Sequence, residues 1–263
     1  MKTLFTESFS EIEKVQTEMS FHDPYSLLNK VNQSPFCWIE VSDHLYDLLQ
    51  KGWNLQMQSN GLFHLTSAHK LQVLGILPTH KNQFTDTNSQ ALTEYPPLLS
   101  FRKEVFTTRS TRYLVKLNRA VRLCVDGIAK GYAVDLAVRK LQEMGIQSGM
   151  INAGGDMIVF GDQTAKIVQK SLHNHQIPQL IELPTLHNQA MATSSQTEHF
   201  DPDHPGWIVH ENGEAAKSAT VSVFAKEAYL ADALTKVFLL TPANCHKKLE
   251  ENFAVKAYYN RTR

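Results

Sequence analysis

The stretch from Asp126 to Gly161 constrains the fold more than any other part of the chain. It reads DGIAKGYAVDLAVRKLQEMGIQSGMINAGGDMIVFG and places a lysine-bearing glycine turn, a helix, a strand and a Gly-Gly-Asp turn in succession. Apolar residues recur at three- and four-residue intervals after Tyr132, which predicts a helix that begins near this residue. We expect Gly145 to end it in a left-handed conformation, and residues 149–153 to form a short buried strand.

The glycine turn suits a ligand that carries several phosphate groups. Gly127 and Gly131 allow backbone amides to point inward, and the helix that follows offers N–H groups with a partial positive charge. Lys130 lies between these glycines as a mobile cation. Asp156 follows a turn at Gly154-Gly155 and can accept hydrogen bonds from a hydroxyl or a ring N–H. An ordinary helix-to-strand unit explains the same glycines, so this pattern alone leaves both readings open.

A second candidate group lies near the C-terminus, in the segment EAYLADALTKVFLL from Glu227 to Leu240. Apolar residues at helical spacing form a core stripe, and Asp232 is expected off that stripe. Thr235 comes three residues later, so both side chains project from the same side of the helix. A carboxylate and a hydroxyl one turn apart can hold a hard cation such as Mg²⁺. Alternatively, Asp232 complements the helix dipole and Thr235 bonds back to a carbonyl, and the segment alone favours this reading.

Composition excludes some classes of partner and indicates a compartment. Lysine plus arginine balance aspartate plus glutamate at 26 each, so nothing predicts a general attraction to nucleic acid or anionic lipid. Cys37, Cys124 and Cys245 are far apart and odd in number, which favours a reducing compartment over a disulfide framework. No run of about eighteen apolar residues predicts a membrane span. The first twenty residues resemble no leader, so we expect a cytoplasmic protein.

The remaining elements follow from periodicity and turn residues. The predicted helices span residues 4–19, 26–31 and 42–51, the last ending at Gly52, and the predicted strands lie within 101–125 and at 166–168, 179–183, 190–195 and 220–224. Residues 81–97 are rich in polar residues and proline and are expected to form an exposed connection. His173 and His175 could share a metal, but no third ligand is nearby, so a turn in solvent explains them better.

Three segments in this order resemble the ApbE family of FAD:protein FMN transferases: DGIAKGYAVD, INAGGD and SATVSVFAKEAYLADALTKVF. The segments MSFHDPYSLLNKVN, SNGLFHLT and MATSSQTEHFDPDHPG extend the resemblance weakly through most of the chain. The resemblance implies an α+β fold, ApbE-like and T-fold-like, with antiparallel sheets flanked by helices in a single domain over residues 1–263. It also implies Mg²⁺-dependent transfer of FMN from FAD to a threonine or serine of an acceptor flavoprotein, with release of AMP.

The resemblance assigns roles by position. Asp232, Thr235 and the carbonyl of Gly127 are expected to hold the metal ion, and His199 is the candidate proton acceptor. The residues expected to contact FAD are His22, Leu62, Phe63, His64, Cys124, Lys130 and Asp156.

Some positions depart from the family pattern, which usually has a tyrosine at His22, aspartates at His64 and Cys124, a glycine at Asp126 and a threonine at Lys236. Each departure removes or moves a polar contact, and Lys236 could repel a cation. A catalytically impaired FAD-binding protein and a Mg²⁺-dependent FAD pyrophosphatase therefore remain alternatives.

Overall fold

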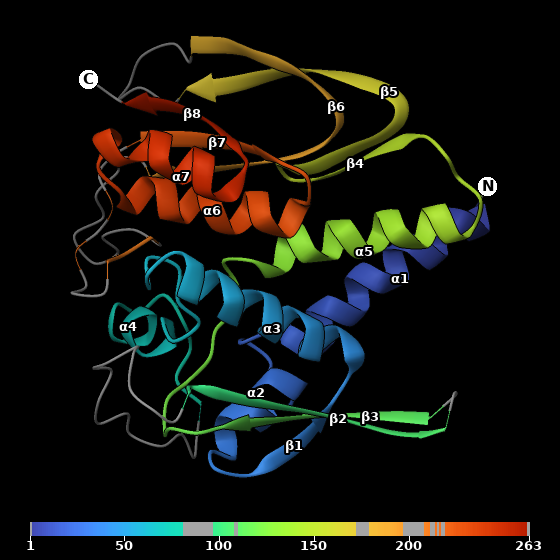
Figure 1. The fold of residues 1–263 in the computed structure, drawn as a ribbon, viewed down its shortest axis with the longest axis vertical. Helices are drawn as coiled ribbons and strands as arrows, with labels where there is room; N and C mark the ends of the chain where they lie inside the picture. The colour runs from blue at the N-terminus through green and yellow to red at the C-terminus, as the bar shows by residue number, and fades with distance from the viewer. Residues whose placement is uncertain are drawn as a thin grey trace. The chain divides into compact units, whose positions relative to one another are not determined.

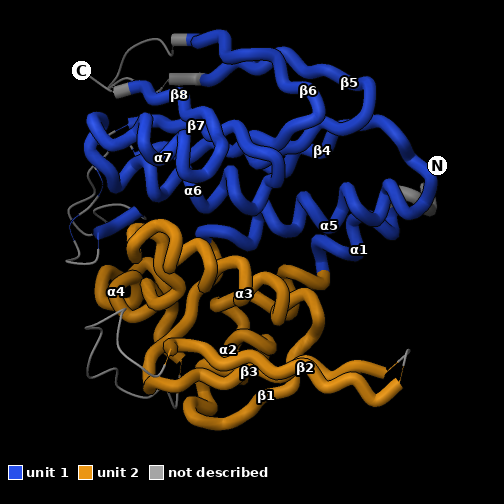
Figure 2. The backbone as a smooth tube through the Cα atoms, in the orientation of Figure 1, with its two compact units in different colours: residues 1–13, 127–263 blue, residues 14–126 orange. Residues whose placement is uncertain are grey.

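The computed structural model describes residues 2–80, 97–107, 110–171, 179–196, 208–210, 214, 216 and 219–261. The chain forms two compact units, of which unit 1 contains residues 1–13 and 127–263 and unit 2 contains residues 14–126 (Figure 2). Helix α1 (Lys2–Met19) runs from unit 1 into unit 2. Each unit has its own antiparallel sheet, which confirms the α+β class. The assignment of the whole chain to a single domain stays a prediction.

Unit 2 combines short helices with a three-stranded sheet. Its helices are α2 (Leu27–Gln33), α3 (Asp43–Gln58) and α4 (Ala68–Val73), and its strands are β1 (Trp38–Val41), β2 (Leu99–Thr107) and β3 (Ser110–Leu117). The strand order is β1-β3-β2 with antiparallel pairing, so the predicted hairpin within 101–125 is confirmed. Ser26 and Ser42 cap α2 and α3, because their side chains accept the N–H groups of Asn29 and Leu45.

The prediction that α3 ends at Gly52 is wrong, because the helix continues to Gln58. A Cβ atom on Gly52 would lie 2.7 Å from Leu65 Cδ2, so this glycine allows close packing inside the helix. The helix ends where Asn60 and Gly61 adopt positive φ angles of 52° and 79°. The chain therefore turns at the Ser-Asn-Gly sequence that follows the helix.

Unit 1 is built on a five-stranded antiparallel sheet in the order β4-β5-β6-β7-β8. Its strands are β4 (Gly149–Ala153), β5 (Asp156–Ser171), β6 (Gln179–Gln196), β7 (Ala219–Ala225) and β8 (Lys256–Arg261), and its helices are α5 (Ala129–Glu143), α6 (Ala228–Leu240), the 3₁₀ turn η1 (Ala243–Cys245) and α7 (His246–Phe253). Helices α5 and α6 pack along the sheet, α5 against β4 and β5 and α6 against β6 and β7 (Figure 1). The strands predicted at 179–183 and 190–195 are parts of one strand.

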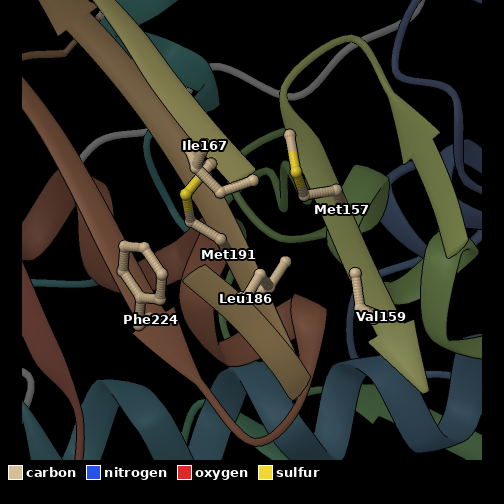
Figure 3. Packing of buried hydrophobic residues seen from close by; sticks show 6 residues of the cluster. All are labelled: Met157, Val159, Ile167, Leu186, Met191 and Phe224. Carbon is tan, nitrogen blue, oxygen red and sulfur yellow. The ribbon is translucent and has the colours of Figure 1, made fainter. Parts of the chain in front are cut away.

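The core of the sheet forms where the long strands β5 and β6 bend. Their register shifts between Val159 and Thr164 and again between Ala165 and Ile167. Gly161 has a φ angle of 69° within the first shift, and a Cβ atom there would lie 2.1 Å from the Gln147 carbonyl oxygen. The bend brings both halves of β5 onto one buried cluster, shown in Figure 3: Met157, Val159, Ile167, Leu186, Met191 and Phe224.

Two details of the predicted helix and strand after the glycine turn need correction. Helix α5 begins at Ala129, so Gly131 lies inside its first turn. The strand at 149–153 is an edge strand whose residues alternate between half-buried and exposed, with Met150 46% exposed, so it is not a buried strand. Gly145 does end α5 at φ 87°, and the N–H of Ile146 bonds to the Leu141 carbonyl, as in a Schellman motif.

Gly131 sets how closely α5 and α6 approach each other. A Cβ atom at this position would lie 2.2 Å from the Ala228 carbonyl oxygen and 2.8 Å from Asp232 Cβ. The first of these neighbours is backbone, which cannot turn aside. The glycine is therefore required by packing between helices, and its φ angle is not left-handed.

We predict that Gly131→Ala lowers the free energy of unfolding by about 2 kcal/mol or more, because overpacking outweighs the gain of roughly 1 kcal/mol from helix propensity. Chemical denaturation followed by circular dichroism measures this change. Arg139→Ala, at an exposed position of the same helix, is the matched control and should have little effect. Unchanged or increased stability of Gly131→Ala would contradict the packing described for α5 and α6.

Candidate functional site

The N-terminus of α6 is capped by a carboxylate from α5. Glu227, the N-cap residue of α6, makes no side-chain capping bond. Instead, Asp135 Oδ1 accepts the N–H of Ala228 at 2.8 Å and Asp135 Oδ2 accepts the N–H of Tyr229 at 2.9 Å. These N–H groups have no partner inside their own helix, and the negative charge also complements the helix dipole. Asp135 was not among the predicted site residues.

The N-terminus of α5 is capped in return by a carboxylate from α6. Its N-cap residue, Ile128, makes no side-chain capping bond. The N–H of Gly131 donates to Asp232 Oδ2 at 3.0 Å, and Asp232 is fully buried. Asp232 lies off the apolar stripe but is buried all the same, because α6 is buried on almost every side except at Lys236 and its first turn. Asp232 of α6 therefore caps the N-terminus of α5.

The other oxygens of Asp232 are also engaged within α6. Lys236 Nζ contacts Asp232 Oδ1 and lies 2.9 Å from the Asp232 carbonyl oxygen. Thr235 Oγ1 donates to the same carbonyl oxygen at 2.6 Å and lies 2.6 Å from Ser194 Oγ on β6. Thr235 thus bonds back to the helix, as the structural reading of this segment expects. The possibility that Lys236 repels a cation remains a prediction, and in this structure its ammonium contacts Asp232 Oδ1.

Lys130 forms an ion pair with the aspartate of the Gly-Gly-Asp turn. Its Nζ atom lies 2.7 Å from Asp156 Oδ2. Asp156 is 1% exposed, whereas the Lys130 side chain is 60% exposed. Burial raises the pKa of Asp156 above its ordinary value, and the negative charge of Asp232 raises it further. The structure therefore brings Lys130, Asp156, Asp232 and Thr235 together in unit 1.

The oxygen atoms around Asp232 are of the kind that Mg²⁺ binds, namely a carboxylate, a hydroxyl and a backbone carbonyl. Their chemistry fits the metal, but in this structure Asp232 Oδ1 carries the Lys236 ammonium. A divalent ion at this oxygen requires Lys236 to move away. The third predicted ligand, the carbonyl of Gly127, lies in the turn before α5. Within the described residues, no group of three or more His, Cys, Asp and Glu side chains could hold a metal ion.

Unit 2 holds a separate group of predicted residues. Cys124 donates its backbone N–H to the Leu65 carbonyl at 2.8 Å, which fixes it against the segment that contains Leu62, Phe63 and His64. Phe63 is buried and the other two are half-buried. The hydroxyl of Ser59, the C-cap residue of α3, accepts the Phe63 N–H at 3.0 Å and so holds this segment against the end of the helix.

Cys124 and His22 both interact with Asp126. Burial raises the pKa of the Cys124 thiol well above its ordinary value, and the charge of Asp126 adds to this effect. The thiol is thus protonated at neutral pH and cannot act as an anion. His22 is exposed. Burial raises the pKa of Asp126, and the nearby His22 partly offsets this rise. The remaining candidate, His199, lies outside the described residues.

The comparisons with known proteins agree with the fold and its motifs. The model of the ApbE family matches residues 2–259, so the chain belongs to the ApbE family. A protein of Rhodobacter capsulatus named FAD:protein FMN transferase is 31% identical over 130 residues, which is 48% of this chain. The match spans only 24% of that relative's length.

Solved structures of flavin transferases share the fold. The apo form of flavinyl transferase ApbE from Pseudomonas stutzeri superposes with a TM-score of 0.75 at 20% identity, covering 98% of this chain and 82% of that one. The ApbE protein of Thermotoga maritima gives 0.74 at 21% identity, with 100% and 89% coverage. Flavin transferase ApbE from Vibrio cholerae gives 0.75 at 19% identity, with 97% and 84% coverage. The predicted ApbE-like fold is confirmed.

We predict that Asp135→Ala lowers the free energy of unfolding by about 1–2 kcal/mol, because two N–H groups of α6 lose their acceptor. Thermal or urea unfolding measures the loss, and Gln142→Ala at an exposed position of α5 serves as the control. Equal stabilities of Asp135→Ala and the control would show that this carboxylate does not cap α6.

Asp156 should make stability depend on pH in a defined direction. A carboxyl whose pKa is raised by folding stabilises the fold at low pH, and this stabilisation is lost as pH rises through the folded value. The free energy of unfolding of the wild type should therefore fall relative to Asp156→Asn as pH rises from about 4, the ordinary carboxyl value, toward neutrality. Urea unfolding across this range measures the difference, with exposed Asp162→Asn as the control. A difference that stays constant would contradict the raised pKa.

Proposed function

We propose that this chain transfers FMN from FAD to a threonine or serine hydroxyl of an acceptor flavoprotein and releases AMP. Membership of the ApbE family and the printed name of its Rhodobacter capsulatus relative support the reaction. The observation that carries the proposal is the bond between Gly131 N–H and Asp232 Oδ2, because it joins the phosphate-type glycine turn to the candidate metal helix. These segments are about a hundred residues apart in the sequence, and each supplies what a diphosphate needs.

The transfer exchanges one phosphorus–oxygen bond for another. The acceptor hydroxyl oxygen bonds to the FMN-side phosphorus, the bond from that phosphorus to the bridging oxygen breaks, and AMP leaves with this oxygen. The hydroxyl proton passes to a base, for which His199 is the proposed residue. Lys130, whose side chain is 60% exposed, is proposed to place positive charge on the diphosphate, and Asp156 to orient it through the ion pair.

The metal and the flavin are assigned to the residues named by the family motifs. Mg²⁺ held by Asp232, Thr235 and the Gly127 carbonyl would draw negative charge from the diphosphate. His22, Leu62, Phe63, His64 and Cys124 are proposed to contact other parts of FAD. Because the Cys124 thiol is buried and protonated, this position lacks the charged acceptor that an aspartate would provide.

An FAD-binding protein with impaired transfer is the second candidate. The contact of Lys236 with Asp232 favours it, because this ammonium engages the carboxylate oxygen that Mg²⁺ needs.

Cys37, Cys124 and Cys245 form no disulfide, and no described helix combines the length and apolar character that a membrane span requires. Free cysteines support a reducing compartment, so we propose that the acceptor is met in the cytoplasm.

We predict that incubation with FAD, Mg²⁺ and an acceptor domain yields flavin fluorescence on the acceptor that survives denaturation. An acceptor whose threonine is replaced by valine should stay unlabelled. Lys130→Met should label the intact acceptor on the order of a hundredfold more slowly, because one stabilising charge is lost.

Two other outcomes would contradict the proposed transfer of FMN. Release of FMN and AMP without any acceptor would identify an FAD pyrophosphatase, in which water takes the place of the hydroxyl. FAD binding without a covalent product on any threonine- or serine-bearing acceptor would identify an FAD-binding protein.

A further inference from the structure

The ion pair between Lys236 and Asp232 is not an ordinary pair on a helix surface. Asp232 is fully buried, and the Lys236 side chain is only 19% exposed. Pairs four residues apart on exposed helices are weak because water screens both charges. Here the Asp232 carboxylate has no access to water, and the Lys236 ammonium is the positive charge in direct contact with it.

Lys236 binds Asp232 in the way that an oxygen-bound cation would. Its Nζ atom contacts the carboxylate oxygen Oδ1 and, at 2.9 Å, the backbone carbonyl oxygen of the same residue. The Thr235 hydroxyl lies at this carbonyl as well. Carboxylate, carbonyl and hydroxyl oxygens are the donors that Mg²⁺ selects, so the ammonium lies among the atoms a metal ion would use.

A metal ion and this ammonium cannot share Oδ1. Two positive charges a few ångströms apart repel strongly in a site with little water. The second carboxylate oxygen, Oδ2, already accepts the Gly131 N–H, so one of its two lone pairs is occupied. A divalent ion that binds Oδ1 must therefore displace Lys236.

Lysine ammonium groups already face the carboxylates around Asp232 without a metal. Lys236 contacts Asp232, and Lys130 pairs with Asp156 in the same part of unit 1. An additional divalent ion at this cluster leaves an excess of positive charge. This excess weakens the binding of a divalent ion alone and favours a divalent ion that is bound to an anionic ligand.

We propose that Lys236 is a built-in counter-ion that competes with divalent metal ions for Asp232. The inference concerns the metal part of the proposed function. Metal ions then bind weakly to the free protein, because each binding event must first break the contact of the ammonium with the buried carboxylate. Removing this ammonium should strengthen metal binding, although it also removes a partner that stabilises Asp232.

The test is a titration of the purified full chain with Mn²⁺, followed by its electron paramagnetic resonance signal, without FAD or acceptor. Lys236→Met should bind Mn²⁺ on the order of tenfold or more tightly than the wild type. In this variant, Mn²⁺ no longer has to break the charged hydrogen bond between Lys236 and Asp232. Lys256→Met is the matched control, because it removes an ammonium at the start of β8 that pairs with Glu250. It should change Mn²⁺ affinity far less, and Lys236→Arg should stay close to the wild type.

Thermal unfolding provides the second measurement. Lys236→Met leaves the buried carboxylate without its ammonium, so its melting temperature should fall without metal and recover more than that of the wild type when Mg²⁺ is added. Should Lys236→Met not fold, Lys236→Gln, which keeps a donor but removes the charge, is titrated instead. Equal or weaker Mn²⁺ affinity of the neutral variant would overturn the proposal. Because no flavin is present, this result would leave the proposed FMN transfer untouched.

Discussion

The N-termini of α5 and α6 depend on each other's carboxylates. Asp135 of α5 accepts two N–H groups at the start of α6, and Asp232 of α6 accepts one at the start of α5. Neither helix has a capping bond from its own N-cap residue. Gly131 makes this exchange possible, because any side chain there would collide with the backbone of Ala228. Two segments distant in the sequence are thereby held at one place on the sheet of unit 1.

This exchange explains why one residue has both a structural and a proposed chemical role. Asp232 Oδ2 is committed to the α5 backbone, which fixes the carboxyl group and leaves Oδ1 in a defined position. A fixed oxygen needs little reorganisation to hold a cation, and this is the main requirement for stabilising charge on a diphosphate. In the free protein that cation is Lys236. A change at Asp232 therefore affects both helix packing and cation binding, and a loss of activity alone would not separate them.

Sequence patterns predicted the parts of the site that are local. The left-handed Gly145, the hairpin of β2 and β3 and the helix around Asp232 follow from turn chemistry and periodicity within short segments. The family motifs also named Lys130 and Asp156, which form an ion pair in the structure.

Contacts between residues that are distant in the sequence could not be predicted from such local patterns. The sequence predicts a helix end at Gly52, because its packing partner, Leu65, is brought near only by the fold. The burial of Asp232 depends in the same way on contacts from α5. The sequence gives one weak indication of the role of Asp135. The N-cap position of α6 holds Glu227 and not Ser, Thr, Asp or Asn, so the first N–H groups of α6 need an acceptor from elsewhere.

Native-state hydrogen exchange tests the reciprocal capping most directly, because N–H groups in the first turn of a helix are ordinarily open to water. NMR would follow the amides of Gly131, Ala228 and Tyr229 in the wild-type chain. All three amides should be protected, with similar free energies of opening, since each capping bond relies on the packing that the other maintains. Exchange of Gly131 at the rate of an exposed amide, while Ala228 and Tyr229 stay protected, would contradict the reciprocal capping.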